Sequence, residues 1–139
     1  MKRGNMLNSE ISAVISRMGH TDGLTIGDAG LPISDECKRI DLAVRPGLPK
    51  FTEVLETVLE ELCVEKILLA EEIRSVNPEG MEEILGIMAE YEKKTGYKPA
   101  MTFVPHEEFK KMTASTKAVV RTGEVMPYAN IILYSGVTF

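Results

Sequence analysis

Apolar side chains recur every three or four positions in three stretches of the chain, which is the spacing of a helix with one buried face. The sequence therefore predicts helices over 9–18, 51–62 and 78–95, with a shorter helix over 106–112. The inner face of the third helix is expected to consist of Met81, Ile84, Leu85, Met88 and Tyr91.

The predicted helix ends carry residues that commonly cap helices. Asn8 or Ser9 can accept a hydrogen bond from the free N–H groups of the first turn, and Asn77 can do the same for the third helix. Glycine enters the left-handed backbone region most cheaply. Gly19 and Gly96 are therefore expected to end the first and third helices.

Short apolar runs between these helices indicate strands. The predicted strands cover 24–29, 64–70, 100–104, 118–121 and 131–134. Residues 33–50 are rich in proline and glycine and indicate a loop, in which a short strand around 40–44 is an open alternative. Strands that alternate with helices predict an α/β fold with a largely parallel sheet. The periodicity leaves open the strand order and whether the last strands form an antiparallel edge.

Length and composition narrow the class of protein. A chain of 139 residues with no repeat and no long linker is expected to form one domain over residues 1–139. The net charge of -5 and the lack of a basic cluster argue against a nucleic-acid partner. No apolar stretch approaches the roughly 20 residues of a membrane span. The basic N-terminus has no apolar run after it, so a cytoplasmic protein without a membrane partner is expected.

The cysteines and the missing motifs exclude further classes. Cys37 and Cys63 are interpreted as two reduced thiols, with one bridge between them as the alternative. The chain contains neither G-x-G-x-x-G nor G-x-x-x-x-G-K-[ST], so a nucleotide cofactor lacks its usual phosphate cradle. No group of His and Cys has the spacing of metal ligands, so no metal is predicted.

A few polar residues at predicted strand and helix ends are the candidates for chemistry. His20 follows the first helix, and a histidine side chain can both give and take a proton in acid–base catalysis. Asp28 closes the first strand, where ligands of α/β sheets bind, and a carboxylate can hold sugar hydroxyls. His106 stands at a strand-to-helix junction. Glu71 and Glu72 also follow a strand, but they are interpreted as a solvated strand end.

The stretch before the last strand offers groups that suit a sugar. Tyr128 has a ring face and a hydroxyl, and Asn130 has both a hydrogen-bond donor and an acceptor. A pyranose stacked on such a ring and bonded to such an amide is common sugar-binding chemistry. An ordinary loop with a buried tyrosine is the alternative that the residues alone leave open.

Taken together, these fragments resemble the D-ribose pyranase family, within the wider group of ribose and fucose mutarotases. The matching blocks occur in order along the whole chain, and they are 7–9, 15–22, 28–32, 70–73, 106–109, 120–124, 127–133 and 136–139. No single block is decisive, but their joint occurrence is specific.

The resemblance implies a fold, an activity and a set of site residues. It implies a three-layer α/β/α domain, with a largely parallel or mixed sheet, that interconverts the pyranose and furanose forms of D-ribose without a cofactor. It implies a cytoplasmic homodecamer of two stacked pentamers with sites near subunit boundaries. The implied proton donor is His20, and the implied substrate contacts are Asp28, His106, Tyr128, Ala129 and Asn130.

Two rival functions remain at this stage. The first is an L-fucose mutarotase, although that branch tends to carry bulkier residues where this chain has Gly30 and Leu31. The second is a non-catalytic sugar-binding or transport-accessory protein that uses the same pocket, because the sequence does not separate binding from turnover.

Overall fold

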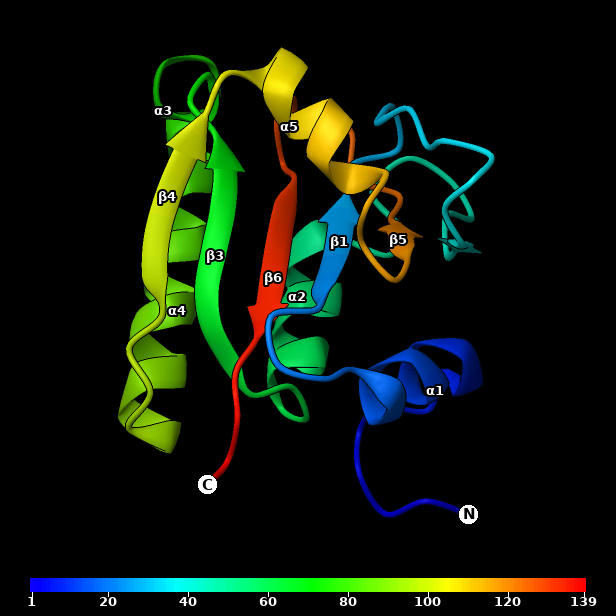
Figure 1. The fold of residues 1–139 in the computed structure, drawn as a ribbon. Helices are drawn as coiled ribbons and strands as arrows, with labels where there is room; N and C mark the ends of the chain where they lie inside the picture. Colours follow the sequence, from blue (N-terminus) through cyan, green and yellow to red (C-terminus); the bar gives the residue numbers. More distant parts are fainter.

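A six-stranded mixed sheet forms the centre of the molecule in the computed structural model, which describes residues 1–139 (Figure 1). The strand order is β2-β5-β1-β6-β3-β4. The strands are β1 (Gly23–Gly27), β2 (Arg39–Asp41), β3 (Val64–Ala70), β4 (Ala100–Val104), β5 (Val119–Arg121) and β6 (Ile131–Ser135). The C-terminal strand β6 pairs antiparallel with β1 and β3, and the other neighbours pair parallel. The predicted α/β fold with a largely parallel or mixed sheet is confirmed, and the antiparallel strand lies inside the sheet.

Helices cover both faces of this sheet and make the three layers that were expected (Figure 1). They are α1 (Ser9–Arg17), α2 (Phe51–Leu59), α3 (Ile73–Val76), α4 (Pro78–Thr95) and α5 (His106–Thr113). On one face, Ile67 and Leu69 of β3 join the core formed with α1, α2 and α4. On the other face, Leu68 joins a smaller core with Phe109 of α5. Alternation along β3 thus places α5 on the face opposite to the long helices.

The helix caps follow the sequence at most ends. Asn8 Oδ1 accepts from the Ile11 N–H at the start of α1, and Gly96 ends α4 in the left-handed region with φ 77°. The expectation for Gly19 is wrong. Met18 ends α1 in an extended conformation, and the left-handed residue of this loop is Thr21, with φ 68°.

Other sequence predictions need correction. The second helix ends at Leu59, three residues early, because the chain turns there towards β3. The short helix α3 has no periodicity long enough to predict it. Leu85 is exposed, because the buried positions of α4 repeat at intervals of three and four residues and leave Leu85 at the edge of the stripe.

Two further observations concern cysteines and membranes. Cys37 and Cys63 are both free thiols, as interpreted from the sequence. None of the helices combines the length and the apolar character that crossing a membrane requires.

Candidate functional site

A pocket of about 360 Å³ lies at the end of the sheet where β1, β3 and β4 finish. Asp28 directly follows β1, and His106 begins α5 two residues after β4. The loop that carries Tyr128 and Asn130 reaches the same end because β6 runs antiparallel and starts there. These four predicted residues line the pocket together. Its volume is at the lower end of the range of about 300–1,000 Å³ for ligand sites and suits a small molecule.

Ala129 is the predicted contact that does not line the pocket. Its side chain is buried in the large core beside the sheet. Only its backbone can therefore take part in ligand binding.

Asp28 and Asn130, which both line the pocket, are joined by two hydrogen bonds. The Asn130 amide Nδ2 donates to Asp28 Oδ2 (3.0 Å), and the Asp28 backbone N–H donates to Asn130 Oδ1 (2.9 Å). The Gly30 N–H donates to the other carboxylate oxygen, Asp28 Oδ1 (2.9 Å). Both groups of the Asn130 amide are thus engaged with Asp28. Asn130 orients the carboxylate, and the carboxylate is the stronger acceptor for a ligand hydroxyl.

Burial also changes the titration of Asp28. Loss of water around the carboxylate raises its pKa above the ordinary value of 3.8. The hydrogen bonds from Gly30 and Asn130 oppose this rise because they favour the charged form. The side chain is therefore partly desolvated and still supplied with fixed donors, which is typical of a carboxylate prepared for a ligand.

His106 lines the same pocket and has an unpaired ring nitrogen. Its Nδ1 is buried and has no hydrogen-bond partner. The ring is edge-on to Tyr128, with 5.0 Å between ring centroids, and stacks near Phe109 at 6.3 Å. Buried polar atoms are nearly always paired, so this unpaired nitrogen marks the His106 ring as a candidate functional group.

Glu72 fixes the position of His106, which the sequence interpretation missed. The His106 backbone N–H donates to both Glu72 carboxylate oxygens at 3.0 Å. The carboxylate therefore satisfies a free N–H at the start of α5, where negative charge is favourable. The interpretation of Glu71-Glu72 as a solvated strand end is wrong for Glu72, which is half-buried and bonded to His106. No sequence spacing signals the contact, because it joins residues 34 positions apart.

Glu124 organises the rim of the pocket and was also missed as a site residue. Its Oε1 accepts from the N–H groups of Val125 and Met126, both at 3.1 Å. Its Oε2 accepts from the Phe51 N–H at the start of α2 (3.4 Å). Val125 and Met126 are exposed apolar side chains beside the pocket. The rim therefore combines a fixed backbone with an uncovered apolar surface.

His20 does not lie at this pocket. Its Nε2 is 2.8 Å from Glu65 Oε2, and the two side chains are 54% and 44% exposed. Glu65 is the second residue of β3, whereas Glu72 and His106 stand beyond the other end of that strand. Seven residues of strand span about 23 Å at 3.3 Å per residue. In Figure 1, α1 and the loop after it lie below β1, and α5 lies at the opposite end of the sheet. Within one chain the predicted proton donor and the predicted binding residues are therefore at opposite ends of the sheet.

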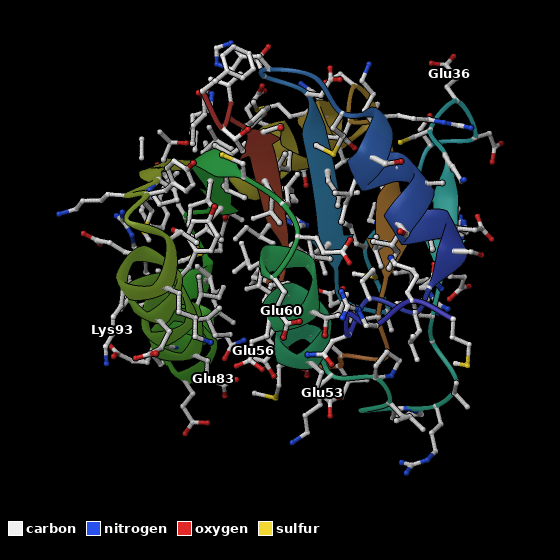
Figure 2. The ribbon with its side chains drawn as sticks, turned by 90° about the horizontal axis from the view of Figure 1, so that it is seen from below. Glu36, Glu53, Glu56, Glu60, Glu83 and Lys93 are labelled. Carbon is white, nitrogen blue, oxygen red and sulfur yellow. The ribbon has the colours of Figure 1, made fainter.

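A larger hollow of about 740 Å³ lies between α2 and α4 on the outer side of the helix layer. Figure 2 shows Glu56, Glu60 and Glu83 on this side of the molecule. None of the six predicted site residues lines the hollow. It contains no histidine, and its carboxylates are not brought into a group that could hold a metal ion. The smaller pocket at the strand ends is therefore the candidate functional site.

The fold and the pocket define a single-domain α/β protein with a small-molecule site at one end of its sheet. A family model described as the RbsD / FucU transport protein family matches residues 1–138. A D-ribose pyranase of Glaesserella parasuis serovar 5 is 51% identical over 139 residues, which is the full length of both chains. This protein belongs to the RbsD / FucU family.

Solved structures agree with this assignment. The structure of Bacillus subtilis RbsD complexed with D-ribose matches with a TM-score of 0.90 and 41% identity, and the match covers 100% of both chains. A fucose mutarotase of Streptococcus pneumoniae in complex with L-fucose matches with a TM-score of 0.79 and 23% identity over the whole of both chains. At that identity the second match shows the shared fold alone.

Proposed function

We propose that this protein is a sugar isomerase that interconverts β-D-ribopyranose and β-D-ribofuranose. The observation that carries the proposal is the pocket at the strand ends, where Asp28, His106 and Tyr128 line a cavity of about 360 Å³. Full-length identity of 51% to a D-ribose pyranase supports ribose as the substrate.

The reaction asks for proton transfer and positioning, which these residue types supply. The C1–O5 bond of the pyranose breaks as the anomeric hydroxyl loses a proton and the ring oxygen gains one. The open aldehyde then closes through the C4 hydroxyl, which gives the furanose. General acid–base assistance is worth about 10²–10⁴-fold. Asp28, held by Asn130, accepts from sugar hydroxyls, while His106 and Tyr128 bind the remaining groups of the sugar.

The proton donor is His20 of a second copy of the chain. His20 and the pocket stand at opposite ends of one protomer, so one chain cannot place both at the same sugar. A head-to-tail contact brings the His20 end of one copy to the pocket of the next, and such contacts close into rings. We infer a ring-shaped homo-oligomer, and by the resemblance a decamer of two stacked pentamers. The free thiols fit a reducing compartment, and we place the enzyme in the cytoplasm.

Proton NMR of ribose tests the activity directly. Exchange between the anomeric signals of the pyranose and furanose forms should be faster with the protein than without it. Ribose should also exchange faster than L-fucose at equal concentration. Gly30 and Leu31 form part of the pocket wall, and the L-fucose mutarotase branch tends to carry bulkier residues at these two positions. Faster exchange of L-fucose would assign the protein to the sister activity. Ribose binding without accelerated exchange would instead identify a sugar-binding protein.

A further inference from the structure

Asn77 connects the start of α4 to the loop that carries Tyr128. The residue is 3% exposed, and both ends of its amide are hydrogen-bonded. Oδ1 accepts from the Gly80 N–H (3.0 Å) and caps α4, while Nδ2 donates to the Pro127 carbonyl oxygen (3.0 Å). The first bond is local to the helix, whereas the second reaches a residue 50 positions away beside the candidate site.

The orientation of this amide is determined by its two partners. A reversed amide would direct its NH₂ group at the Gly80 N–H and its oxygen at the Pro127 carbonyl, and both bonds would be lost. The absence of a side chain at Gly80 leaves the necessary space, because a Cβ there would overlap the Asn77 amide nitrogen. Helix cap and loop bond are therefore made by one fixed side chain.

The bond from Asn77 acts on a strained part of the loop. Tyr128 has a φ of 59°, and the left-handed region is unfavourable for a residue with a Cβ. The Pro127 carbonyl belongs to the peptide group whose nitrogen is that of Tyr128. A bond that fixes this carbonyl resists the rotation about φ by which Tyr128 would relax. On the other side, the Asn130 N–H donates to the Tyr128 carbonyl (2.9 Å).

We propose that Asn77 is a positioning residue for ribose binding, which it serves by holding Tyr128 in its strained conformation. Asn77 does not line the pocket. It acts through the peptide group between Pro127 and Tyr128, which sets where the tyrosine ring meets His106. The proposal deepens the proposed function and rests on it.

Two substitutions separate the loop bond from the helix cap. Serine and aspartate are both good N-cap residues. In Asn77→Ser, the serine side chain is too short to reach the Pro127 carbonyl. In Asn77→Asp, the ionised carboxylate has no hydrogen to donate to that carbonyl. One lost hydrogen bond corresponds to a rise in the KM for ribose of about three- to tenfold. The kcat should change by less than about twofold, because the bond acts on binding. The matched controls are Asn8→Ser and Asn8→Asp, which alter the cap of α1 and should leave both constants unchanged.

A double-mutant cycle distinguishes positioning through Tyr128 from a merely structural role. In the wild-type background, Asn77→Ser should raise the KM for ribose by about three- to tenfold. In the Tyr128→Gly background, the same substitution should raise KM by less than about twofold, because glycine has no ring to position and little strain at φ 59°. Equal effects in the two backgrounds would overturn the proposal. So would a wild-type KM in both folded Asn77 variants, or loss of the folded state in both. If the wild-type protein itself does not accelerate the exchange of ribose anomers, the proposed function is wrong. That result is distinct from a failure of the Asn77 proposal, which requires an active wild-type protein with unchanged KM in the Asn77 variants or equal effects in the two backgrounds.

Discussion

Two inactive variants should restore each other's activity if the site is shared between chains. The first carries His20→Gln, which keeps a hydrogen-bond donor but cannot deliver a proton near neutral pH. The second carries Asp28→Asn, which removes the charged acceptor and loses one of the two bonds that the carboxylate oxygens accept from Asn130 and Gly30. Because the two residues lie at opposite ends of each protomer, every proposed site takes His20 from one chain and Asp28 from another.

The size of the recovery follows from this geometry. Loss of the proton donor should reduce exchange by about 10²–10⁴-fold, so the His20→Gln homo-oligomer is nearly inactive. The Asp28→Asn homo-oligomer lacks the charged acceptor in every pocket and should be nearly inactive as well. When the two chains are present in equal amounts and assort at random, an intact His20 meets an intact pocket in about one quarter of the interfaces. The mixed oligomer should therefore show about one quarter of the wild-type exchange rate per chain.

The assay is anomeric NMR exchange on oligomers co-expressed from two differently tagged genes and purified through both tags. The matched control is Asp28→Asn mixed with His106→Gln, since both changes affect the same pocket and no assortment repairs it. That mixture should stay inactive. Mixed His20→Gln and Asp28→Asn oligomers that assemble and still lack activity would refute the shared site.

The remaining predictions concern titration, strain, packing and metals. Burial raises the pKa of Asp28 in the folded state above the ordinary value of 3.8. The protonated carboxyl therefore contributes to the free energy of unfolding in full below the pKa of the unfolded state, and this contribution is lost as pH rises through the pKa of the folded state. Urea unfolding should therefore show Asp28→Asn gaining stability relative to wild type between pH 3 and 7, and a constant difference would contradict this. In chemical unfolding, Tyr128→Gly should be about 1 kcal/mol more stable than Tyr128→Ala, because only alanine keeps a Cβ at φ 59°; equal stability would argue against the strain. Leu133→Ala should cost about 2–5 kcal/mol at a fully buried position of β6, against less than about 0.5 kcal/mol for exposed Leu7→Ala, and a similar cost at both would contradict the core assignment. Ribose exchange should survive exhaustive EDTA treatment, and activity that is lost and then restored by zinc would contradict the mechanism.

Local sequence determined most of the secondary structure. The strands over 64–70 and 100–104 have the predicted bounds, and the helix between Asn77 and Gly96 has the predicted caps. These features depend on hydrophobic spacing and on caps, both of which act within a few residues. The same local reasoning failed for Gly19, because an extended Met18 ends α1 before the glycine is reached.

Only part of the candidate site could be predicted from local sequence. Asp28 could be placed at the end of a strand, where α/β proteins bind ligands. That Asp28 bonds Asn130, 102 positions away, follows from β6 entering the sheet beside β1 in the antiparallel direction. Nothing in the sequence indicated that Glu72 and Asn77 support the site, because each contacts a residue far away along the chain. Glu72 bonds His106, 34 positions away, and Asn77 bonds Pro127, 50 positions away.

Hydrophobic periodicity records which residues of each segment face a core, since burial is decided by the repeat of the helix or strand itself. It carries no information on which strands become neighbours, because strand pairing depends on the packing of segments that are far apart along the chain. The sequence by itself therefore determined the α/β class, the elements and the family resemblance. Only the tertiary structure decided that Asp28, His106 and Tyr128 share one pocket and that His20 lies at the other end of the sheet.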